Sequence, residues 1–216
     1  PIEYRLPAIG QIQVKPKIGL TFANGLRHIL RQDPDVVLVG ETRDAETAEI
    51  AVRASLTGHL VFTTLHTNDA PSAVMRLVDM GVEPYLLASC LRGVVAQRLV
   101  RRLCPHCATA VTADDPSLGA AEAAAARAAG GRVRRAVGCP RCLEGYAGRL
   151  GIFEFMPCGA EIAESIHRGE LAADDLLAIA KRTPGCSAMR DDAAAKLRAG
   201  ETSPAEIVAA LGAIWS

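Results

Sequence analysis

The 216-residue sequence has no G-x-x-x-x-G-K-[S/T] loop, the glycine-rich motif whose backbone amides hold nucleotide phosphates. It also lacks an apolar run of the roughly 18–20 residues that a membrane-spanning helix requires, so no transmembrane segment is predicted. Basic and acidic residues are balanced at 24 each, and the formal net charge is zero. Bulk charge therefore gives no reason to expect a nucleic-acid or membrane-surface partner.

A secretory signal is absent too, since the sequence opens at Pro1 and continues into the acidic Glu3. A chain that begins with proline instead of methionine is expected to be a fragment or a processed product. The sequence contains seven cysteines, so they cannot all be paired within the chain. This usage favours a reducing compartment, where thiols bind metal or pack in the interior instead of forming disulfides.

The first part of the sequence alternates helical and strand patterns, and its apolar residues can bury a sizeable core. Asp44 is placed to cap a helix, and the branched residues before it predict a strand buried on both faces. Alternating strands and helices predict an α/β fold with a parallel sheet covered on both sides. The expected order is helix 21–33, strand 36–39, helix 44–58, buried strand 59–65 and a helix from Asn68 or Asp69.

The amino-acid composition changes after Arg98. A basic stretch ends in "CPHC", and an alanine- and glycine-rich stretch over 117–131 fits either a surface helix or a loose insert. "GCPRC" then precedes a predicted strand over 148–156. Short helices are expected over 160–168, 173–181, 187–199 and 203–212. We therefore expect three consecutive domains: a sheet domain 1–98, a metal-bearing subdomain 99–156 and a helical subdomain 157–216.

Two C-x-x-C units, with 31 residues between them, predict a metal site. Two intervening residues let both thiolates of a unit reach one tetrahedral ion, and four protein ligands leave no open position, so the site is expected to hold structural zinc. A proline after the first cysteine stiffens each unit. Redox pairs or buried thiols are the alternatives, and each is a weaker interpretation of two matching units. The four expected ligands are Cys104, Cys107, Cys139 and Cys142; Cys90, Cys158 and Cys186 are expected to pack in the interior.

Glu41 follows the strand at 36–39, where the sequence reads "DVVLVGETRD". Ligands of open α/β sheets gather at the carboxyl ends of the strands, so this carboxylate suits a Mg²⁺–phosphate site. An ordinary salt bridge is an equally good interpretation of this stretch alone. His59 and His66 flank the next strand, and a histidine at the exit of that strand could reach a phosphate oxygen, although such a residue is more often an ordinary polar one.

Taken together, these stretches resemble the ATPases of type II secretion and type IV pilus assembly. "PIEYRLPAIGQIQVKPKIGLTF" is similar to the end of that family's Asp box and the segment after this box. "LRQDPDVVLVGETRDAETAEIAVRASLTGHLVFTTLHTNDA" resembles the Walker B and His boxes. "VVAQRLVRRLCPHC" and "GCPRCLEGYAGRLGIFE" resemble its tetracysteine segment, which secretion and pilus-extension members carry and retraction members lack. The type II secretion E protein is the most similar subfamily.

The resemblance implies a RecA-like core truncated at its N-terminus, since the family's phosphate-binding loop lies upstream of the Asp box. It implies that Glu41 acts with Mg²⁺ and the attacking water, that Glu3 polarises this water and that His66 lies near the γ-phosphate of ATP. Gly40 and His59 would contribute to nucleotide binding. The tail also fits the family pattern at Met189, Asp192, Lys196, Gly200, Thr202 and Glu206. The chain departs from the pattern at Thr42 and Ala193, neither of which is a catalytic group.

The expected function is therefore that of the C-terminal part of a hexameric cytoplasmic ATPase. It would associate peripherally with the bacterial inner membrane through secretion-platform proteins, and it would drive pseudopilus assembly. Without the phosphate-binding loop, these 216 residues alone are expected to be inactive. One alternative is pilus extension or DNA-uptake pilus assembly. Another is a zinc module that binds nucleic acid through Arg98, Arg101, Arg102 and 132–135, although few aromatic residues stand near these arginines to stack on bases.

Overall fold

The computed structural model describes residues 2–212. The chain divides into two compact units, each assembled from two separate segments. The first unit comprises the described residues up to 94 together with 157–182. The second comprises 95–156 together with the described residues from 183 onward. Within residues 2–212, no helix is long and apolar enough to cross a membrane.

The first unit contains a pair of parallel strands, β1 (Val36–Val39) and β2 (Leu60–Thr63). Their register runs from Val36 opposite Leu60 to Val39 opposite Thr63. Both strands lie within the ranges expected from the sequence. Because they are parallel, the residues after β1 and after β2 leave the sheet at the same edge.

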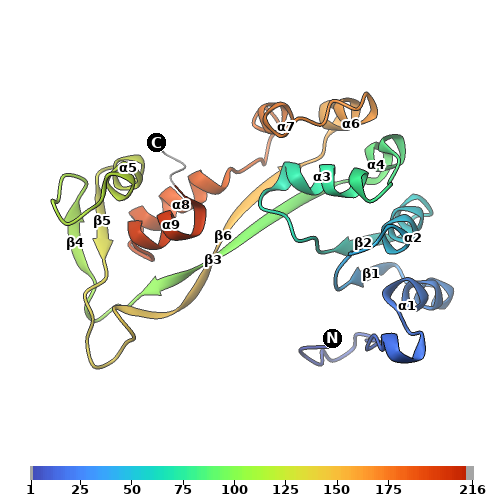
Figure 1. The fold of residues 1–216 in the computed structure, drawn as a ribbon, viewed down its shortest axis with the longest axis horizontal. Coiled ribbons are helices and arrows are strands. Elements are labelled where there is room, and N and C mark those ends of the chain that lie inside the picture. The colour runs from blue at the N-terminus through green and yellow to red at the C-terminus, as the bar shows by residue number, and fades with distance from the viewer. Residues whose placement is uncertain (1, 213–216) are drawn as a thin grey trace. The chain divides into compact units, whose positions relative to one another are not determined.

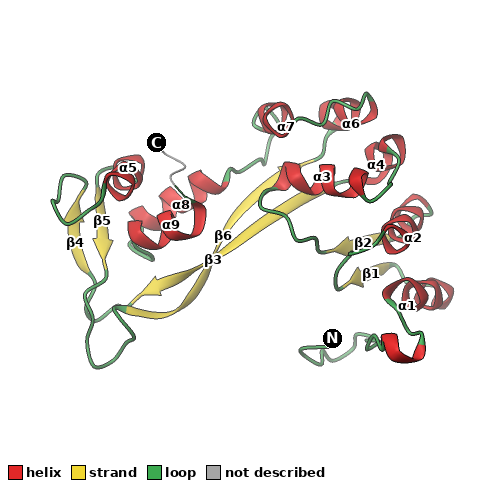
Figure 2. Ribbon diagram, in the orientation of Figure 1, coloured by secondary structure: helices red, strands yellow, loops and turns green. Residues whose placement is uncertain are grey.

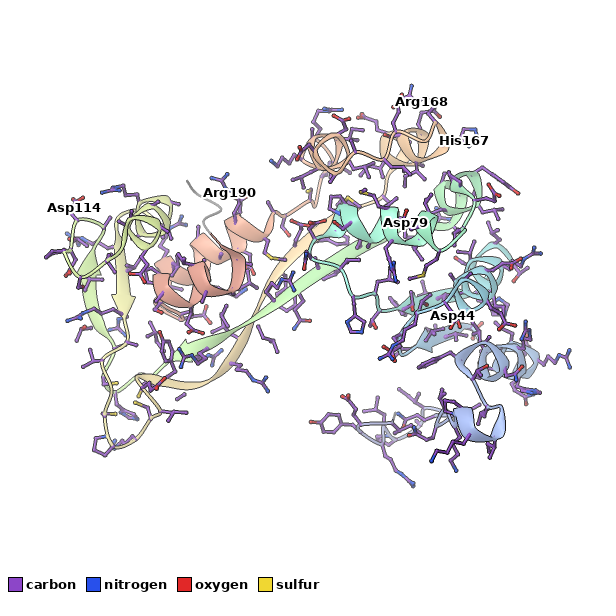
Figure 3. The ribbon with its side chains drawn as sticks, viewed as in Figure 1. Asp44, Asp79, Asp114, His167, Arg168 and Arg190 are labelled. Carbon is purple, nitrogen blue, oxygen red and sulfur yellow. The ribbon has the colours of Figure 1, made fainter. Side chains whose placement is uncertain are left out.

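Two helices cover one face of this pair (Figure 1). Helix α1 (Phe22–Ile29) begins at Thr21 and continues into a 3-10 turn, η2 (Leu30–Gln32), before Pro34. Helix α2 (Ala45–Leu56) begins at Asp44, whose side chain accepts a hydrogen bond from the backbone N–H of Thr47 at 2.8 Å (Figure 3). The buried core between helices and strands consists of Leu26, Val37, Val39 and Ala51.

The expectation that both faces of the strands are buried is wrong for the described residues. Val36, Leu38, Leu60 and Phe62 are between 48% and 69% exposed. In the observed register these four side chains lie on the same face, opposite Val37. Helices α1 and α2 bury only the face of the strand pair that carries Val37. Nothing within residues 2–212 buries the opposite face to a comparable degree. The periodicity therefore predicted the strands correctly and their burial incorrectly.

Most other regular elements of the first unit are helices. Helix α3 (Ala70–Asp79) starts at Asp69 with Pro71 in its first turn, as expected from the sequence. It packs against α7 (Ala173–Ala180), while α4 (Pro84–Cys90) packs against α6 (Ala160–His167). A short 3-10 turn, η1 (Pro16–Ile18), precedes α1.

Most of the second unit is built on two long neighbouring strands, β3 (Gly93–Leu103) and β6 (Tyr146–Pro157), which run in opposite directions (Figure 2). Between them in sequence lies an antiparallel pair, β4 (Thr109–Thr112) and β5 (Arg132–Arg135), joined through α5 (Ala120–Ala128). The helices α8 (Met189–Arg198) and α9 (Pro204–Leu211) complete the unit, and both pack against α5.

The three consecutive domains expected from the sequence differ from this grouping. The last four helices, expected as one subdomain, divide between the units: α6 and α7 join the first, and α8 and α9 join the second. The alanine-rich stretch is a helix instead of a loose insert, because Ala123, Ala125 and Ala126 are buried on one side of it. Small side chains here allow α5 to pack closely against its neighbours.

Candidate functional site

Hydrogen bonds at the carboxyl ends of β1 and β2 hold the turn that carries Glu41. After β1, the backbone N–H of Thr42 donates to the carbonyl of Thr64 at 3.0 Å. The hydroxyl of Thr64 donates to the carbonyl of Gly40 at 2.6 Å. These bonds tie the turn after β1 to Thr64, the first residue after β2, and so hold Glu41 at the edge of the sheet.

The Glu41 carboxylate meets two cationic or ionisable neighbours. Its Oε2 lies 2.5 Å from Nε of Arg43 and 3.3 Å from Nε2 of His66. The Glu41 side chain is 17% exposed, whereas that of His66 is 82% exposed, so the imidazole forms the open side of the site. The Arg43 guanidinium, with a smaller contribution from His66, outweighs burial and lowers the pKa of Glu41. The carboxylate is consequently ionised at neutral pH, as a metal or water ligand must be.

His59 lies at the opposite edge of the sheet. It precedes β2, and its Nδ1 is 2.9 Å from the carbonyl oxygen of Ala54 and 3.2 Å from the hydroxyl of Thr57. A four-residue parallel strand separates its two ends by roughly 13 Å. The structure thus does not bring His59 to Glu41, and the contacts of His59 secure the end of α2 instead.

Glu3 and Gly40, the other two expected site residues, differ in their placement. Gly40 adjoins Glu41, but a Cβ at this position would meet only the Phe22 ring at an ordinary 3.6 Å, so space does not demand glycine. Glu3 is exposed in the segment before α1, next to Ile2, whose N–H donates to Oε1 of Gln13. Within residues 2–212 its carboxylate makes no hydrogen bond or ion pair, so the structure does not join it to Glu41.

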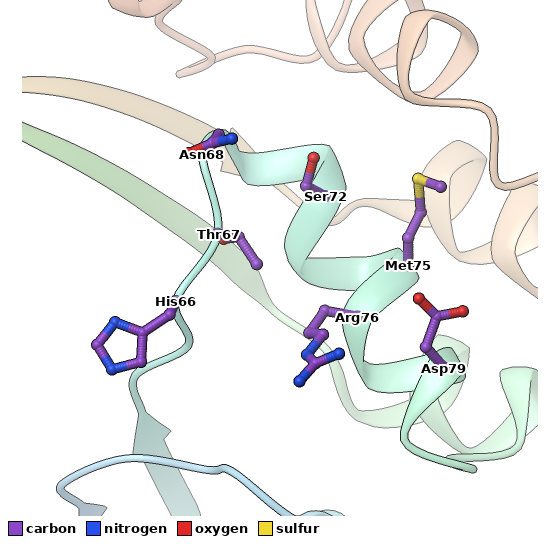
Figure 4. Close-up of a pocket in the computed structure, with 7 residues that line it drawn as sticks. All are labelled: His66, Thr67, Asn68, Ser72, Met75, Arg76 and Asp79. Atoms are coloured by element: carbon purple, nitrogen blue, oxygen red, sulfur yellow. The ribbon is translucent and has the colours of Figure 1, made fainter. Parts of the chain in front are cut away.

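An open pocket of about 300 Å³ adjoins His66 (Figure 4). One wall is the loop after β2, with His66 and Asn68, and the other is α3, with Ser72, Arg76 and Asp79. Arg76 is mostly solvent-facing, and it adds a guanidinium to the side of the site that His66 leaves open. The pocket therefore combines hydrogen-bond donors from His66, Asn68 and Arg76 with the carboxylate of Asp79. Glu41 does not line it and adjoins it only through His66.

Four cysteines converge in the second unit. Cys104, Cys107, Cys139 and Cys142 place their Sγ atoms within 4.8 Å of one another. The Sγ–Sγ distances are 3.9 Å for Cys104–Cys139, 3.7 Å for Cys107–Cys142 and 3.6 Å for Cys139–Cys142. A tetrahedral zinc ion with Zn–S bonds of 2.3 Å requires about 3.8 Å between sulfurs. The donor set and its spacing therefore fit zinc.

Backbone N–H groups aim at these sulfurs. Gly138 N–H donates to Sγ of Cys107 at 3.4 Å, and Cys139 N–H donates to Sγ of Cys142 at 3.3 Å. Burial raises the pKa of Cys107 to about 11. Burial also acts to raise that of Cys142, but hydrogen bonds, chiefly from Cys139, lower it to about 7. Metal binding would deprotonate the thiols that ligate the ion, so metal affinity depends on pH.

The other three cysteines lie outside this cluster. Cys90, Cys158 and Cys186 are each partly buried, so the expected interior positions hold only in part. Burial raises the pKa of Cys90 and brings that of Cys158 to about 12. Such thiols are protonated at neutral pH, which makes them poor nucleophiles.

The parallel pair of strands with a carboxylate at its edge is thus followed in sequence by a tetracysteine centre. The chain belongs to the type II/IV secretion system protein family, whose pattern matches residues 1–209. It is 53% identical over 209 residues to the type II secretion system protein HxcR of Pseudomonas aeruginosa. It is 47% identical over 210 residues to the type IV pilus assembly ATPase PilB of Thermus thermophilus.

These relatives are much longer than the present chain. The alignments cover 96% and 97% of this chain but only 40% of HxcR and 23% of PilB. Among solved structures, the ATPase DotB of Legionella pneumophila superposes with a TM-score of 0.65 over 95% of this chain and 48% of DotB. Its sequence identity is 23%, so this likeness concerns the fold alone.

The sequence-based prediction missed Arg43 as a partner of Glu41. Its proximity was visible in "GETRD", since a side chain two residues away can return to the same side of an extended segment. Local sequence gave no indication that Arg101 of β3 would bind the second unit's C-terminal helix, because Glu206 lies 105 residues further along.

Proposed function

We propose that this chain is the C-terminal part of a secretion ATPase, in which Glu41 activates the water that attacks ATP. The supporting observation is the meeting of the ionised Glu41 and the exposed His66 at one edge of two parallel strands. Bound Mg²⁺ would shield the phosphate charges and hold ordered water there. His66 would donate a hydrogen bond to a γ-phosphate oxygen as that charge develops.

The remaining expected residues receive different roles. Gly40 shapes the turn that presents Glu41 to the nucleotide, and Glu3 is proposed to approach this edge once nucleotide and further protein surround it. His59 supports the site indirectly, because its contacts hold the end of α2 and the start of β2. Its substitution should lower stability more than it changes the chemistry.

The phosphate-binding loop is proposed to come from a part of the protein that the relatives have and these 216 residues do not include. The sequence contains no G-x-x-x-x-G-K-[S/T] motif, and the chain spans less than half the length of the relatives named above. Backbone amides and a lysine of such a loop hold the β- and γ-phosphates. These 216 residues by themselves should therefore neither bind ATP tightly nor hydrolyse it.

The tetracysteine centre is proposed to hold a structural zinc ion. Four thiolates complete a tetrahedral shell and leave no position for water or substrate. Zinc should thus stabilise the second unit without entering the reaction. Metal analysis of freshly purified protein should find one zinc per chain, and a value well below one would contradict this assignment.

In the cell, the protein is proposed to act as a homo-hexamer in the cytoplasm, docked on inner-membrane secretion-platform proteins. ATP binding and hydrolysis would close and open the ring and drive assembly of pilin-like subunits for type II secretion. The similarity to a type II secretion protein slightly exceeds that to a pilus ATPase and supports this choice. Extension of a type IV or DNA-uptake pilus is the alternative with the same chemistry.

Complementation tests the choice between these roles. A strain without the gene should lose secretion of extracellular proteins and keep its pili, and the wild-type gene should restore secretion. Glu41→Gln should not restore it, whereas Arg53→Ala, which removes an exposed ion pair with Glu49 on α2, should. Loss of pili with intact secretion would favour the pilus role.

Nucleic-acid binding receives little support. Arg101 is held by Glu206 and Glu144, and Arg102 lies 3.7 Å from Glu201, so acidic residues already neutralise part of the basic stretch. Filter binding of the protein at low salt should detect no complex. Tight binding that weakens steeply with added salt would instead support the nucleic-acid module.

A further inference from the structure

The last residues of β3 hold the C-terminal tail on one side and the metal centre on the other. The carbonyl of Arg101 accepts a hydrogen bond from the hydroxyl of Thr202 at 2.9 Å. The N–H of Leu103 donates to the carbonyl of Glu201 at 2.9 Å. One residue later, the N–H of the metal ligand Cys104 donates to the carbonyl of Gly145 at 2.8 Å. Within four residues, the backbone therefore connects α8–α9 to both halves of the tetracysteine site.

The side chain of Arg101 makes the same connection a second time. Its Nε and one terminal nitrogen donate to Oε1 of Glu206 at 2.9 and 2.7 Å, and its backbone N–H donates to Oε2 at 2.8 Å. Its other terminal nitrogen donates to Glu144 at 3.0 Å. The guanidinium also lies 4.0 Å from the ring centroid of Tyr146. One planar group thus joins α9 to the turn directly after the ligand Cys142.

That turn has an unusual composition. Leu143 and Tyr146 pair through two backbone hydrogen bonds, and the two residues between them both have positive φ, 52° at Glu144 and 89° at Gly145. Two-residue turns of this kind favour asparagine or glycine at the first position. A glutamate there adopts a left-handed backbone conformation that residues with a Cβ disfavour. Its carboxylate contacts Arg101, which is a reason for glutamate at a position that the backbone does not favour.

The tail end of the network is buried. Thr202 and Ser203 are 0% and 2% exposed, and the hydroxyl of Ser203 lies 2.8 Å from that of Tyr146. The same Ser203 oxygen accepts the N–H of Glu206 at 3.3 Å and so begins α9. Burial acts to raise the pKa of Glu206, but its bonds with Arg101 lower it overall, so the pair is ionised at neutral pH. Displacement of α9 would expose or orphan each of these groups.

We propose that Arg101 is a positioning residue for the metal centre, and that metal binding and docking of α9 strengthen each other. This inference rests on the zinc site of the proposed function. The Arg101 ion pairs are partly exposed, so their charge attraction alone is weak. Their importance is geometric: they fix the β3 end that carries Cys104 against the turn after Cys142. Linkage then requires that whatever loosens α9 weakens metal binding, and that metal loss loosens α9 by the same factor.

Competition with a chromogenic chelator tests the first half of this linkage. Outer residues that orient metal ligands change affinity by about 10- to 100-fold. The purified zinc-loaded protein with Arg101→Ala should therefore release zinc at about 10-fold lower chelator concentration than wild type. Arg127→Ala is the matched control, because it removes an ion pair with Asp114 elsewhere in the same unit. Equal zinc retention by the Arg101 and Arg127 variants would overturn the inference.

Glu144→Gly provides a milder test if Arg101→Ala does not fold. It removes one hydrogen bond to Arg101 and relieves the backbone, so the turn itself should persist. Loss of one such bond corresponds to roughly 3- to 10-fold weaker zinc retention. Retention as tight as wild type, or tighter, would contradict the role of the Glu144 contact.

Hydrogen exchange of wild-type protein tests the second half. Amides of α9 should exchange at least several-fold faster after chelation, while those of α2 in the first unit should not change. Unchanged protection of α9 would overturn the linkage even if zinc is bound. Failure of the zinc assignment is distinguishable from failure of the linkage. If the site does not hold zinc, wild-type protein will contain no stoichiometric zinc and every variant will behave alike.

Discussion

At the scale of single residues, the site depends on groups that stand close in sequence and on one that does not. Arg43 is two residues from Glu41, and His66 arrives from the end of the neighbouring strand. The sequence located Glu41 and His66 at strand ends, which are recognisable from branched residues followed by polar ones, and the family resemblance suggested their roles in a site. It also placed His59 before the second strand, at the end away from Glu41, and only the family resemblance suggested that His59 contributes to nucleotide binding.

Arg43→Ala should raise the pKa of Glu41 toward its ordinary value of 4.5, since Arg43 is the main cause of its lowering. The favourable contribution of the ionised Glu41 is present at neutral pH and is lost as pH falls through its depressed pKa. In the variant that loss should begin at higher pH. NMR titration of the Glu41 side-chain carboxyl carbon measures this directly, and an unchanged midpoint would show that Arg43 does not control the charge.

Gly145→Ala should be far more destabilising than Gly131→Ala. Both glycines have positive φ, 89° and 83°, so both substitutions incur about 1 kcal/mol of backbone strain. A Cβ at Gly145 would also lie 2.6 Å from Cβ of Ala136, whereas nothing lies within 4 Å of one at Gly131. We expect losses of about 3 and about 1 kcal/mol of unfolding free energy. Denaturant unfolding of zinc-loaded protein measures both, and equal losses would contradict the steric argument.

At the scale of elements, helices were more predictable than strands. Helix starts could be predicted from local chemistry, as at Asp44 and Asp69, whose side chains accept the expected backbone hydrogen bonds. The strands β3, β4 and β5 were missed, because their pairing partners lie far away in sequence and their basic residues obscure the alternation. The length of β3 is stabilised by β6 and the tail, which no local window contains.

Asp44→Ala should cost about 1 kcal/mol of stability in the first unit, because the N–H of Thr47 loses its cap. Glu49→Ala on the same helix is the control. It removes only an exposed ion pair with Arg53, and its effect should stay within about 0.5 kcal/mol. Hydrogen exchange of α2 amides under mild denaturant separates the two, and equal effects would mean that the cap does not stabilise the helix.

At the scale of the whole molecule, the two units should respond differently to metal removal. Structural zinc supplies on the order of 10 kcal/mol of apparent binding free energy at neutral pH. A strong chelator should therefore unfold much of the second unit, including α8 and α9, and leave β1, β2 and their helices folded. Residue-resolved hydrogen exchange reports each unit separately. Cooperative loss of both units, or of neither, would contradict this division.

The whole-molecule grouping was the least predictable feature of the fold. The sequence predicted that the four C-terminal helices form one subdomain, because they follow one another as short helical segments separated by glycines. The structure instead assigns α6 and α7 to the first unit through α4 and α3, and α8 and α9 to the second through α5. Which surface a short helix packs against depends on complementary shapes in distant segments, and these are not encoded in its own periodicity.

Mg²⁺-dependent ATP hydrolysis by the proposed full-length protein is the most direct test of the role of Glu41. Glu41→Gln keeps the size of the side chain and removes its charge. It should lower kcat at least about 100-fold, with zinc content unchanged. Arg53→Ala should hydrolyse ATP like wild type. Full activity of the Glu41 variant would contradict the central claim that this strand-end carboxylate drives the reaction. Glu41-dependent turnover by the 216 residues alone would contradict the separate expectation that they are inactive without a phosphate-binding loop.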